Sequence, residues 1–259
     1  MAKKHLGQNF LFDPAILTKI VEAADIAADD TVVEIGPGHG SLTRLLAQRA
    51  RRVVAIELDP DLYQKLSEDP QLPEAVTLVF GDALTYAYEE LGPFKVVANI
   101  PYYITTPIIF RLLEAKEQLV SMTLTIQKEV AERIVAGPNT KDYGVLSLGV
   151  QFYADPRIAF IIPRSAFRPA PKVDSAVIHM TIRKTPRVRV RDERLFFRTV
   201  KTAFSQRRKT LSNALKPLAK DVRDVLIEAG IDPARRAETL SIEEFAKLAD
   251  LLADRAPHR

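Results

Sequence analysis

Residues 31–41 read Thr-Val-Val-Glu-Ile-Gly-Pro-Gly-His-Gly-Ser, an apolar β-branched run followed by a glycine-rich turn. The first five of these residues have the composition of a buried strand, and helical apolar spacing begins after the turn. Because glycine lacks a Cβ, Gly36, Gly38 and Gly40 let the backbone take dihedral angles that other residues avoid and approach a ligand closely. This strand, turn and helix predict a parallel α/β sheet with a ligand bound at the turn.

The first two thirds of the chain repeat this alternation of short β-branched runs and helical spacing, which indicates helices on both faces of one sheet. The predicted strands are Thr31–Ile35, Val53–Glu57, Val76–Phe80, Lys95–Asn99, Val120–Ile126, Arg157–Ile162 and Ser175–Ile182. The predicted helices among them are Ser41–Ala50, Asp61–Glu68, Ala83–Leu91, Thr106–Lys116, Lys128–Ala136 and Tyr143–Phe152. We therefore expect a Rossmann-like sheet of seven strands, mostly parallel.

After Thr185 and Pro186 the strand pattern stops, and only helical spacing follows. The predicted helices here are Glu193–Phe204, Arg208–Leu215, Val222–Ala229 and Ile242–Leu252, the last preceded by the capping-box pattern of Ser241 and Glu244. We expect two domains: residues 1–184 hold the sheet, and residues 185–259 form a small all-helical domain.

The composition excludes several classes of protein. The chain has 259 residues and no Cys, so disulfides, thiolate nucleophiles and Cys-ligated zinc are excluded. No metal site is predicted, because the four histidines are scattered, and no apolar run approaches the roughly 18 residues of a membrane helix. The N-terminus also lacks the apolar segment of a signal peptide, so we expect a cytoplasmic protein that contacts no membrane. The histidines are His5, His39, His179 and His258.

The net charge of +4 conceals a strong asymmetry along the chain. Residues 1–156 carry a net charge of −7, residues 157–217 carry +13, and residues 218–259 carry −2. Only three acids lie within the basic segment, too few to pair with its 16 Lys and Arg residues. Such a segment favours a nucleic-acid partner.

Three sites at three consecutive strand ends converge on one crevice. Glu57 lies 21 residues after Gly36, where a carboxylate can accept both hydroxyls of a ribose. Asp82 follows the next strand, where it could accept from an adenine amino group. The turn has the spacing G-x-G-x-G rather than the G-x-G-x-x-G of dinucleotide sites, which favours an adenosine cofactor without phosphates, such as S-adenosylmethionine. We therefore expect an adenosine cofactor at the carboxyl edge of the Rossmann-like sheet.

The fourth predicted strand ends in Asn99-Ile100-Pro101-Tyr102. The amino group of adenine is a poor nucleophile because its lone pair is conjugated into the ring. The Asn99 amide oxygen and the Ile100 carbonyl could each accept one N6 hydrogen, while Pro101 fixes the turn and Tyr102 stacks on the flipped base. Methyl transfer would then be assisted mainly by proximity and orientation.

These motifs resemble the KsgA family of small-subunit ribosomal RNA adenine dimethyltransferases over essentially the whole chain. The matching segments are HLGQNFL (5–11), VEIGPGHGSLT, VVAIELD, GDAL, NIPYYITTP, IQKEVAERIVAGP, YGVLS, AFRPAPKVDSAV and AFSQRRKTLSNAL. The family usually has Leu where Ile100 stands, a change that keeps the backbone carbonyl. The resemblance implies the fold of a class I S-adenosylmethionine-dependent methyltransferase. It also implies that Asn9 and Leu11 join Gly36, Glu57, Asp82 and Asn99 at S-adenosylmethionine.

The resemblance also implies that Phe167 closes the second face of the target base, opposite Tyr102. Without it, Phe167 would be expected in the core. The basic side chains near this loop, and a basic cluster on the helical domain, would hold RNA phosphates. They are Arg164, Arg168, Lys172, Arg207, Arg208 and Lys209.

The function implied is methylation of N6 on two adjacent adenines in the 3′-terminal hairpin loop of 16S rRNA, within the small ribosomal subunit or its precursor. An Erm-type large-subunit rRNA methyltransferase remains the nearest alternative, because it shares the catalytic tetrapeptide. A ribosome-assembly factor that acts mainly by binding, and a dehydrogenase, are further alternatives. We expect a monomer with a large RNA-facing surface.

Overall fold

The computed structural model describes residues 8–255, so His5, His258 and the start of the 5–11 segment lie outside the described residues. The chain divides into two compact units. The first unit comprises the residues up to Ala131 together with Asp155–Ile182, and the second comprises Glu132–Ala154 and the residues from Arg183 onward.

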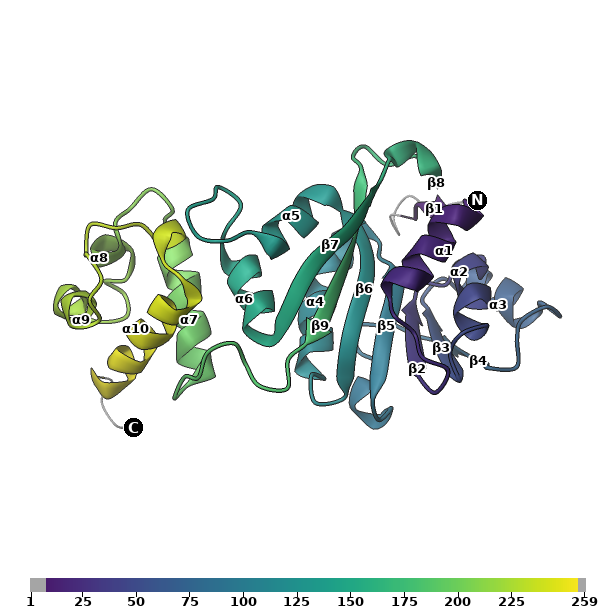
Figure 1. Cartoon of the computed structure of the whole chain (residues 1–259), viewed down its shortest axis with the longest axis horizontal. Coiled ribbons are helices and arrows are strands. Elements are labelled where there is room, and N and C mark those ends of the chain that lie inside the picture. Colours follow the sequence, from purple (N-terminus) through teal and green to yellow (C-terminus); the bar gives the residue numbers. More distant parts are fainter. Residues whose placement is uncertain (1–7, 256–259) are drawn as a thin grey trace. The chain divides into compact units, whose positions relative to one another are not determined.

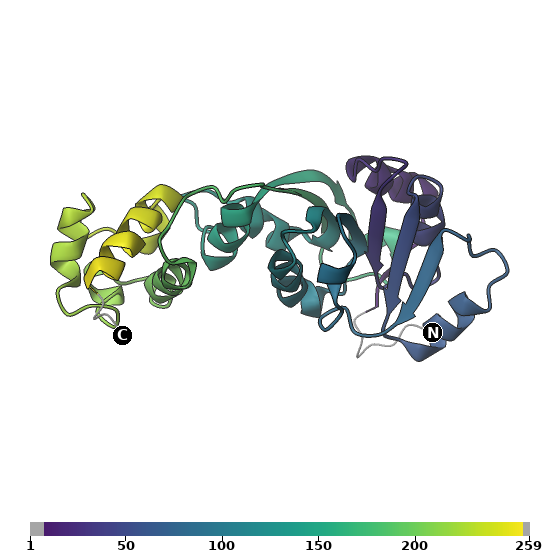
Figure 2. The same cartoon turned by 90° about the horizontal axis from the view of Figure 1, so that it is seen from below.

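The first unit holds a seven-stranded sheet in the order β4-β3-β2-β5-β6-β9-β7, flanked by helices on both sides (Figures 1 and 2). The pairings among β2, β3, β4, β5 and β6 are parallel, and β9 runs antiparallel to β6. This confirms the predicted fold class. The strands are β2 (Thr31–Ile35), β3 (Arg52–Glu57), β4 (Val76–Phe80), β5 (Phe94–Asn99), β6 (Leu119–Gln127), β7 (Ala154–Ile162) and β9 (Ser175–Ile182).

The central strands are buried on both faces, which is why their sequences are continuously apolar rather than alternating. In β2 and β3 the paired residues Val32 and Val53, and Val33 and Val54, are all fully buried. Parallel pairing in register brings the carboxyl ends of β2, β3, β4 and β5 to one edge of the sheet, where ligands bind in such folds.

Helix α1 (Pro14–Ala23) was not predicted, although its start carries a clear signal. Asp13 caps it, accepting hydrogen bonds from the backbone of Ala15 and Ile16, and Pro14 stands at its first position. The other helices of the first unit are α2 (Ser41–Ala47), α3 (Pro60–Ser67) and α4 (Thr105–Glu114), while α5 (Lys128–Val135) crosses into the second unit.

The predicted helix Ala83–Leu91 is wrong. The Asp82 side chain accepts a hydrogen bond from the Leu84 backbone, which forms a turn, and only the 3₁₀ helix η2 (Tyr88–Glu90) follows before Gly92. An Asp that bonds backbone groups two residues ahead favours turns over helix. A second 3₁₀ helix, η3 (Tyr102–Ile104), follows β5.

A two-stranded antiparallel sheet joins β1 (Phe10–Leu11) to β8 (Phe167–Arg168), which lie more than 150 residues apart in sequence. Leu11 stands opposite Phe167. Both belong to an apolar cluster with residues of α1, β2 and α2. The N-terminal arm is therefore fixed to the loop that precedes β9.

The second unit is helical and has its own core. Its helices are α6 (Val145–Tyr153), α7 (Glu193–Phe204), α8 (Leu211–Ala214), α9 (Val222–Glu228) and α10 (Ile242–Arg255). The predicted domain division placed residues 132–154 with the sheet, but Tyr143, Leu148 and Phe152 pack in one cluster with Phe196 and Phe245. The buried aromatic rings of this cluster come from before β7 (Tyr143 and Phe152) and from after β9 (Phe196, Phe204 and Phe245), a grouping that sequence order alone does not reveal.

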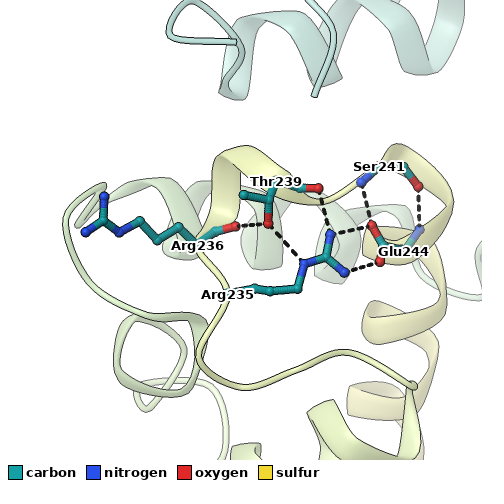
Figure 3. Close-up of polar contacts among 5 residues, drawn as sticks. All are labelled: Arg235, Arg236, Thr239, Ser241 and Glu244. Carbon is teal, nitrogen blue, oxygen red and sulfur yellow. Dashed lines mark hydrogen bonds and ion pairs between the residues drawn. The ribbon is translucent and has the colours of Figure 1, made fainter. Parts of the chain in front are cut away.

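Arg235 and Glu244 organise the segment that leads into α10 (Figure 3). The Arg235 guanidinium donates to both Glu244 carboxylate oxygens, at 2.5 and 3.0 Å, and to the Thr239 carbonyl at 2.7 Å. Ser241 and Glu244 exchange backbone-to-side-chain bonds, which confirms the predicted capping box. The same carboxylate thus caps the helix and binds the arginine.

Candidate active site

A pocket of about 770 Å³, including the space open to solvent, lies at the carboxyl edge of the first unit's sheet. That size is typical of small-molecule sites. Nine of the predicted site residues line it: Asn9, Gly36, Gly38, Glu57, Asp82, Asn99, Ile100, Pro101 and Tyr102. Residues from four strand ends and the N-terminal arm therefore meet in one place.

Leu11, Gly40 and Phe167 do not line this pocket. Gly40 is the N-cap of α2, where its φ of 75° suits glycine. Leu11 and Phe167 are buried in the apolar cluster, and no part of Phe167 is exposed. The ring predicted to cover the second face of the target base is thus a core residue in this structure, held there by its pairing with the N-terminal arm.

The glycine turn is shaped by close approach as well as by backbone conformation. Gly38 has a φ of 58°, in the left-handed region, and a Cβ at this position would lie 2.9 Å from the Phe10 ring. Gly36, with a φ of 69°, has nothing within 4 Å of such a Cβ. The Phe10 ring also lies against His39, with a centroid separation of 4.7 Å. The arm therefore packs directly on the turn.

Glu57 ends β3 and is almost fully buried. Its carboxylate accepts hydrogen bonds from the backbone N–H of Gly38, at 3.1 Å, and of Asp59, at 2.9 Å. Burial raises the pKa of Glu57, and the two backbone donors act in the opposite direction. One carboxylate therefore connects the glycine turn to the start of α3, at the position that the sequence predicted for a ribose acceptor.

Asp82 lies at the pocket wall after β4. Its Oδ1 accepts the Leu84 N–H at 2.9 Å, and no described residue bonds Oδ2. The next residue, Ala83, is held through its carbonyl, which accepts a 2.8 Å hydrogen bond from the buried Tyr88 hydroxyl. The hydrogen bond to Oδ1 therefore orients the carboxylate, and Oδ2 can still accept a hydrogen bond from a ligand.

Asn99 is the last residue of β5, and its side-chain orientation is defined by the N-terminal arm. The Asn99 Nδ2 donates to the Asn9 carbonyl at 2.9 Å. Because the amide nitrogen is committed to this bond, the Oδ1 atom remains as the acceptor. The neighbouring Ile100 N–H donates to Thr125 O at 3.1 Å, which anchors the tetrapeptide to β6.

Tyr102 is a half-buried ring anchored at its far end. Its hydroxyl and that of Ser175 on β9 form a 2.7 Å hydrogen bond. Burial raises the pKa of Tyr102, so the phenol stays protonated at neutral pH. The ring is therefore a neutral, oriented platform in the pocket wall.

The pocket is also lined by residues that were not predicted, and Gln8, Leu58 and Tyr103 are among them. Gln8 Nε2 donates to Asp59 Oδ2 at 3.0 Å, and Asp59 is the N-cap of α3. Leu58 and Tyr103 are 46% and 56% exposed, so each presents an accessible apolar surface at the pocket. Their positions directly after Glu57 and Tyr102 were the available signal.

Glu34, inside β2, is buried with no hydrogen-bond partner for its Oε2 atom. Burial raises the pKa of Glu34 to about 8, although the Thr43 hydroxyl acts in the opposite direction. It lines a smaller cavity shared with Asn99 and Gly36. The carboxyl group is therefore neutral at pH 7.

Of the basic residues predicted to bind RNA, three lie in the first unit and three in the second. In the first unit, Arg168 donates to the Ser165 and Phe167 carbonyls, and Arg164 donates to the Lys172 carbonyl. In the second unit, Arg207 donates to the Lys141 carbonyl at 2.6 Å. Arg164 and Arg168 therefore also stabilise their own loop, whereas Arg207 joins the turn after α7 to the segment at Lys141. The Lys172, Arg208 and Lys209 side chains are exposed, with no side-chain partner among the described residues.

Within residues 8–255, no group of three or more His, Asp or Glu side chains could hold a metal ion. In the same part of the chain, no helix has the length and apolar character needed to cross a membrane.

The chain is similar to known proteins along nearly its whole length. A sequence profile described as "Ribosomal RNA adenine dimethylase" matches residues 1–254. "Ribosomal RNA small subunit methyltransferase A" of Clostridium botulinum (strain Okra / Type B1) is 50% identical over 258 residues, covering 97% of this chain and 94% of that protein. The protein of the same name from Listeria welshimeri is 48% identical over 268 residues, covering 97% and 91%.

Two solved structures share the architecture. A dimethyladenosine transferase from Plasmodium falciparum has a TM-score of 0.80 and 27% identity, covering 92% of this chain and 95% of that one. The 23S rRNA methyltransferase ErmE has a TM-score of 0.72 and 30% identity, covering 95% and 100%.

Proposed function

The chain belongs to the ribosomal RNA adenine dimethylase family, and from this premise we propose that it dimethylates N6 of two adjacent adenines in the 3′-terminal hairpin loop of 16S rRNA. The methyl donor is S-adenosylmethionine. The observation that carries the proposal is the fixed orientation of Asn99, whose amide nitrogen is bonded to the arm and whose oxygen is thereby left to accept.

The donors and acceptors of the pocket suit an adenosine cofactor without phosphates. Glu57 would hold the ribose hydroxyls and Asp82 the adenine amino group, and Leu58 offers an exposed apolar surface to the purine ring. Gly36 and Gly38 allow close approach, and Asn9 and Leu11 belong to the arm that packs on the same turn. When bound, the cofactor supplies an activated methyl group on a sulfonium.

The protein's own contribution to chemistry is orientation. Asn99 Oδ1 and the Ile100 carbonyl accept the two N6 hydrogens, which helps localise the nitrogen lone pair toward the methyl group. Pro101 fixes the turn, and the anchored Tyr102 ring stacks on the base. No residue would need to remove a proton before transfer: as the new N–C bond forms the sulfonium would leave as a neutral thioether, and the methylated N6 would then lose one proton to solvent.

Replacing Asn99 with Ala tests this assignment. Loss of one transition-state hydrogen-bonding group typically costs about 10²-fold to 10³-fold in rate, so transfer of tritiated methyl to undermethylated small subunits should fall by about that much. Affinity for S-adenosylhomocysteine, by calorimetry, and for the small subunit should fall far less. Asn213→Ala, on the second unit, is the matched control. Retained activity in Asn99→Ala would remove Asn99 from the mechanism.

The choice of the small-subunit RNA rests on similarity along the whole chain. Identity is 50% to a small-subunit methyltransferase and 30% to ErmE. Primer extension on rRNA from a strain lacking the native activity should show the paired mark restored in 16S rRNA. A mark in 23S rRNA would instead support the Erm-type alternative.

We further propose that the protein acts as a monomer on the small subunit or its precursor in the cytoplasm, with a role in subunit biogenesis. Phe167 would cover the second face of the base only after leaving its buried position. Arg164, Arg168, Lys172, Arg207, Arg208 and Lys209 would contact phosphates, with the helical residues 185–259 as the main RNA-binding region.

A further inference from the structure

The Tyr102 hydroxyl, at the end of the ring farthest from the backbone, has a single polar partner. It lies 2.7 Å from the hydroxyl of Ser175 on β9. Among residues 8–255, neither of these two side chains makes another hydrogen bond. Stacking on a base needs only the face of the ring, which a phenylalanine would offer equally well. The proposed stacking role of Tyr102 therefore leaves its hydroxyl unexplained.

The local structure around Tyr102 does little to fix its ring. The 3₁₀ helix η3 has three residues, and none of them is buried. Hydrogen bonds in 3₁₀ helices have poorer geometry than those in α-helices, so η3 is also a weak restraint on the backbone. Within the described part of the chain, no other aromatic ring packs on Tyr102. The bond to Ser175 is therefore the specific contact that orients the ring.

Ser175, in contrast, is held in place independently of Tyr102. It is fully buried, begins β9 and pairs in register with the last residue of β6. The preceding residue, Asp174, is fixed at two points. Its carbonyl accepts the Lys128 N–H at 3.0 Å, and its carboxylate accepts the Arg164 N–H at 2.9 Å. The Ser175 hydroxyl is therefore a rigid anchor for the Tyr102 ring.

The two proposed acceptors for the N6 hydrogens are also rigid. The Asn99 amide nitrogen is bonded to the Asn9 carbonyl, and the Ile100 N–H is bonded to Thr125 O. Adenine has two N6 hydrogens and can satisfy both acceptors, but N6-methyladenine has one hydrogen and leaves one acceptor without a donor. The methylated intermediate therefore depends more than adenine on stacking for its orientation.

We propose that Ser175 is a positioning residue for the second methyl transfer, because it holds the Tyr102 ring in the orientation that aligns N6-methyladenine. This rests on the proposed function and deepens it. In the second transfer, as in the first, the N6–C bond forms while the methyl–sulfur bond breaks, the sulfur leaves as a neutral thioether, and N6 loses one proton to solvent. Ser175 acts through Tyr102 and exchanges no proton in either step.

The test compares Ser175→Ala, Tyr102→Phe and the variant with both substitutions. Each is incubated with undermethylated small subunits, and nucleoside mass spectrometry follows N6-methyladenine and N6,N6-dimethyladenine over time. Loss of one hydrogen bond corresponds to about fivefold in rate, so the second transfer should slow by about that factor relative to the first. The monomethylated nucleoside should therefore accumulate in all three variants.

The combined variant separates positioning from a merely structural effect. Each single substitution leaves one hydroxyl without its partner and should lower the thermal stability, whereas the combined substitution removes both hydroxyls and should recover much of that loss. The ratio of the two products should stay perturbed. The control is Ser147→Ala in the second unit, which removes an equally buried hydroxyl bonded to the Arg133 carbonyl. It should lower thermal stability and leave the product ratio unchanged.

The parental product ratio in both single variants, or equal slowing of the two transfers, would overturn the proposal. So would a product ratio that recovers together with stability in the combined variant, because the effect would then be structural. If the unaltered protein makes no dimethyladenine in 16S rRNA, the proposed function itself fails. That result is seen in the unaltered protein alone and is therefore distinct from failure of the role of Ser175.

Discussion

Some positions in the pocket accept only one residue type, and Gly38 is the clearest case. Gly38 has a left-handed backbone conformation, and a Cβ there would collide with the Phe10 ring. Gly36 has the same left-handed conformation, but a Cβ there would meet no neighbouring atom. The sequence predicted that both glycines would permit close approach. It did not indicate that the neighbour would be the N-terminal arm, since Phe10 and Gly38 meet only after the chain has folded.

The two glycines therefore offer a matched comparison. Gly36→Ala should cost about 1 to 2 kcal/mol of stability through its positive φ alone. Gly38→Ala should cost more, because Phe10 must move, and it should also weaken cofactor binding. Urea unfolding and calorimetry measure both quantities. Combining Gly38→Ala with Phe10→Ala should remove the excess over Gly36→Ala, and persistence of that excess would exclude the contact as its cause.

Because the pKa of Glu34 is raised in the folded protein, we expect this residue to make the protein less stable as the pH rises. Its pKa is about 8 in the folded protein and near 4.5 when unfolded, so between these values the folded state binds more protons. Stability from this group is full below about pH 4.5 and is lost as pH rises toward 8, with a slope of up to about 1.4 kcal/mol per pH unit. Glu34→Gln should abolish this contribution. Urea unfolding at pH 5, 6, 7 and 8 should therefore show the variant gaining on the parent protein as pH rises, and parallel curves would contradict this.

The periodicity of the sequence predicted the helices and strands that have one or both faces in the core. It missed the short strands that form only because a distant segment pairs with them. β2, β4, β9 and α7 have the predicted bounds, because their periodicity reflects the core they face. The two-residue strands β1 and β8 carry no periodicity, and the segment Ala83–Leu91 has helical spacing but is shaped by the Asp82 turn. Burial of Phe167 follows from the β1 pairing and could not be read from its loop.

The 3₁₀ helix η2 positions the pocket wall. Arg111 of α4 donates to Glu89 and to the Tyr86 carbonyl, and its guanidinium lies 5.2 Å from the centre of the Tyr88 ring. The Tyr88 hydroxyl then donates to the carbonyl of Ala83, beside Asp82. A chain of contacts therefore connects α4 with the proposed adenine acceptor.

Tyr88→Phe should break this chain while preserving the packing of the ring. Losing one hydrogen bond costs about 1 kcal/mol, so cofactor affinity should fall by up to about fivefold, with kcat and the KM for RNA unchanged. Tyr86→Phe is the control, because the Tyr86 hydroxyl makes no hydrogen bond among the described residues. An equal effect of the two substitutions on calorimetric affinity would remove the positioning role of Tyr88.

For the whole molecule, the two units have separate cores, and the proposed functions divide between them. The pocket lined by Asn99 lies within the first unit, whereas Arg207, Arg208 and Lys209 belong to the second. The asymmetry of charge along the sequence does not follow this division, because the basic segment 157–217 spans both units and the acidic segment 218–259 lies in the second. The inclusion of residues 132–154 in the helical unit could not be anticipated, because it depends on aromatic packing between distant segments.

Separate cores predict separable stability. Phe196→Ala removes a fully buried ring from the second core and should cost that unit about 3 to 5 kcal/mol. Phe197→Ala, at a partly buried neighbour, should cost less. Limited proteolysis should detect opening of the second unit, while calorimetric affinity for S-adenosylhomocysteine stays unchanged. A parallel loss of cofactor affinity would show that the two cores are not independent.

The strand order of the sheet bears on how the protein folds during synthesis. β7 is an edge strand adjacent only to β9, and β1 pairs only with β8. Both partners lie within residues 167–182, which leave the ribosome last among the first unit's segments. Until then, β1 and β7 lack the partners they have in the folded sheet and β6 lacks one of its two, and such unsatisfied backbone groups invite pairing with other chains. Ribosomal pausing before residue 167 should therefore favour aggregation, whereas a pause after residue 182 should leave a first unit whose strands are all paired.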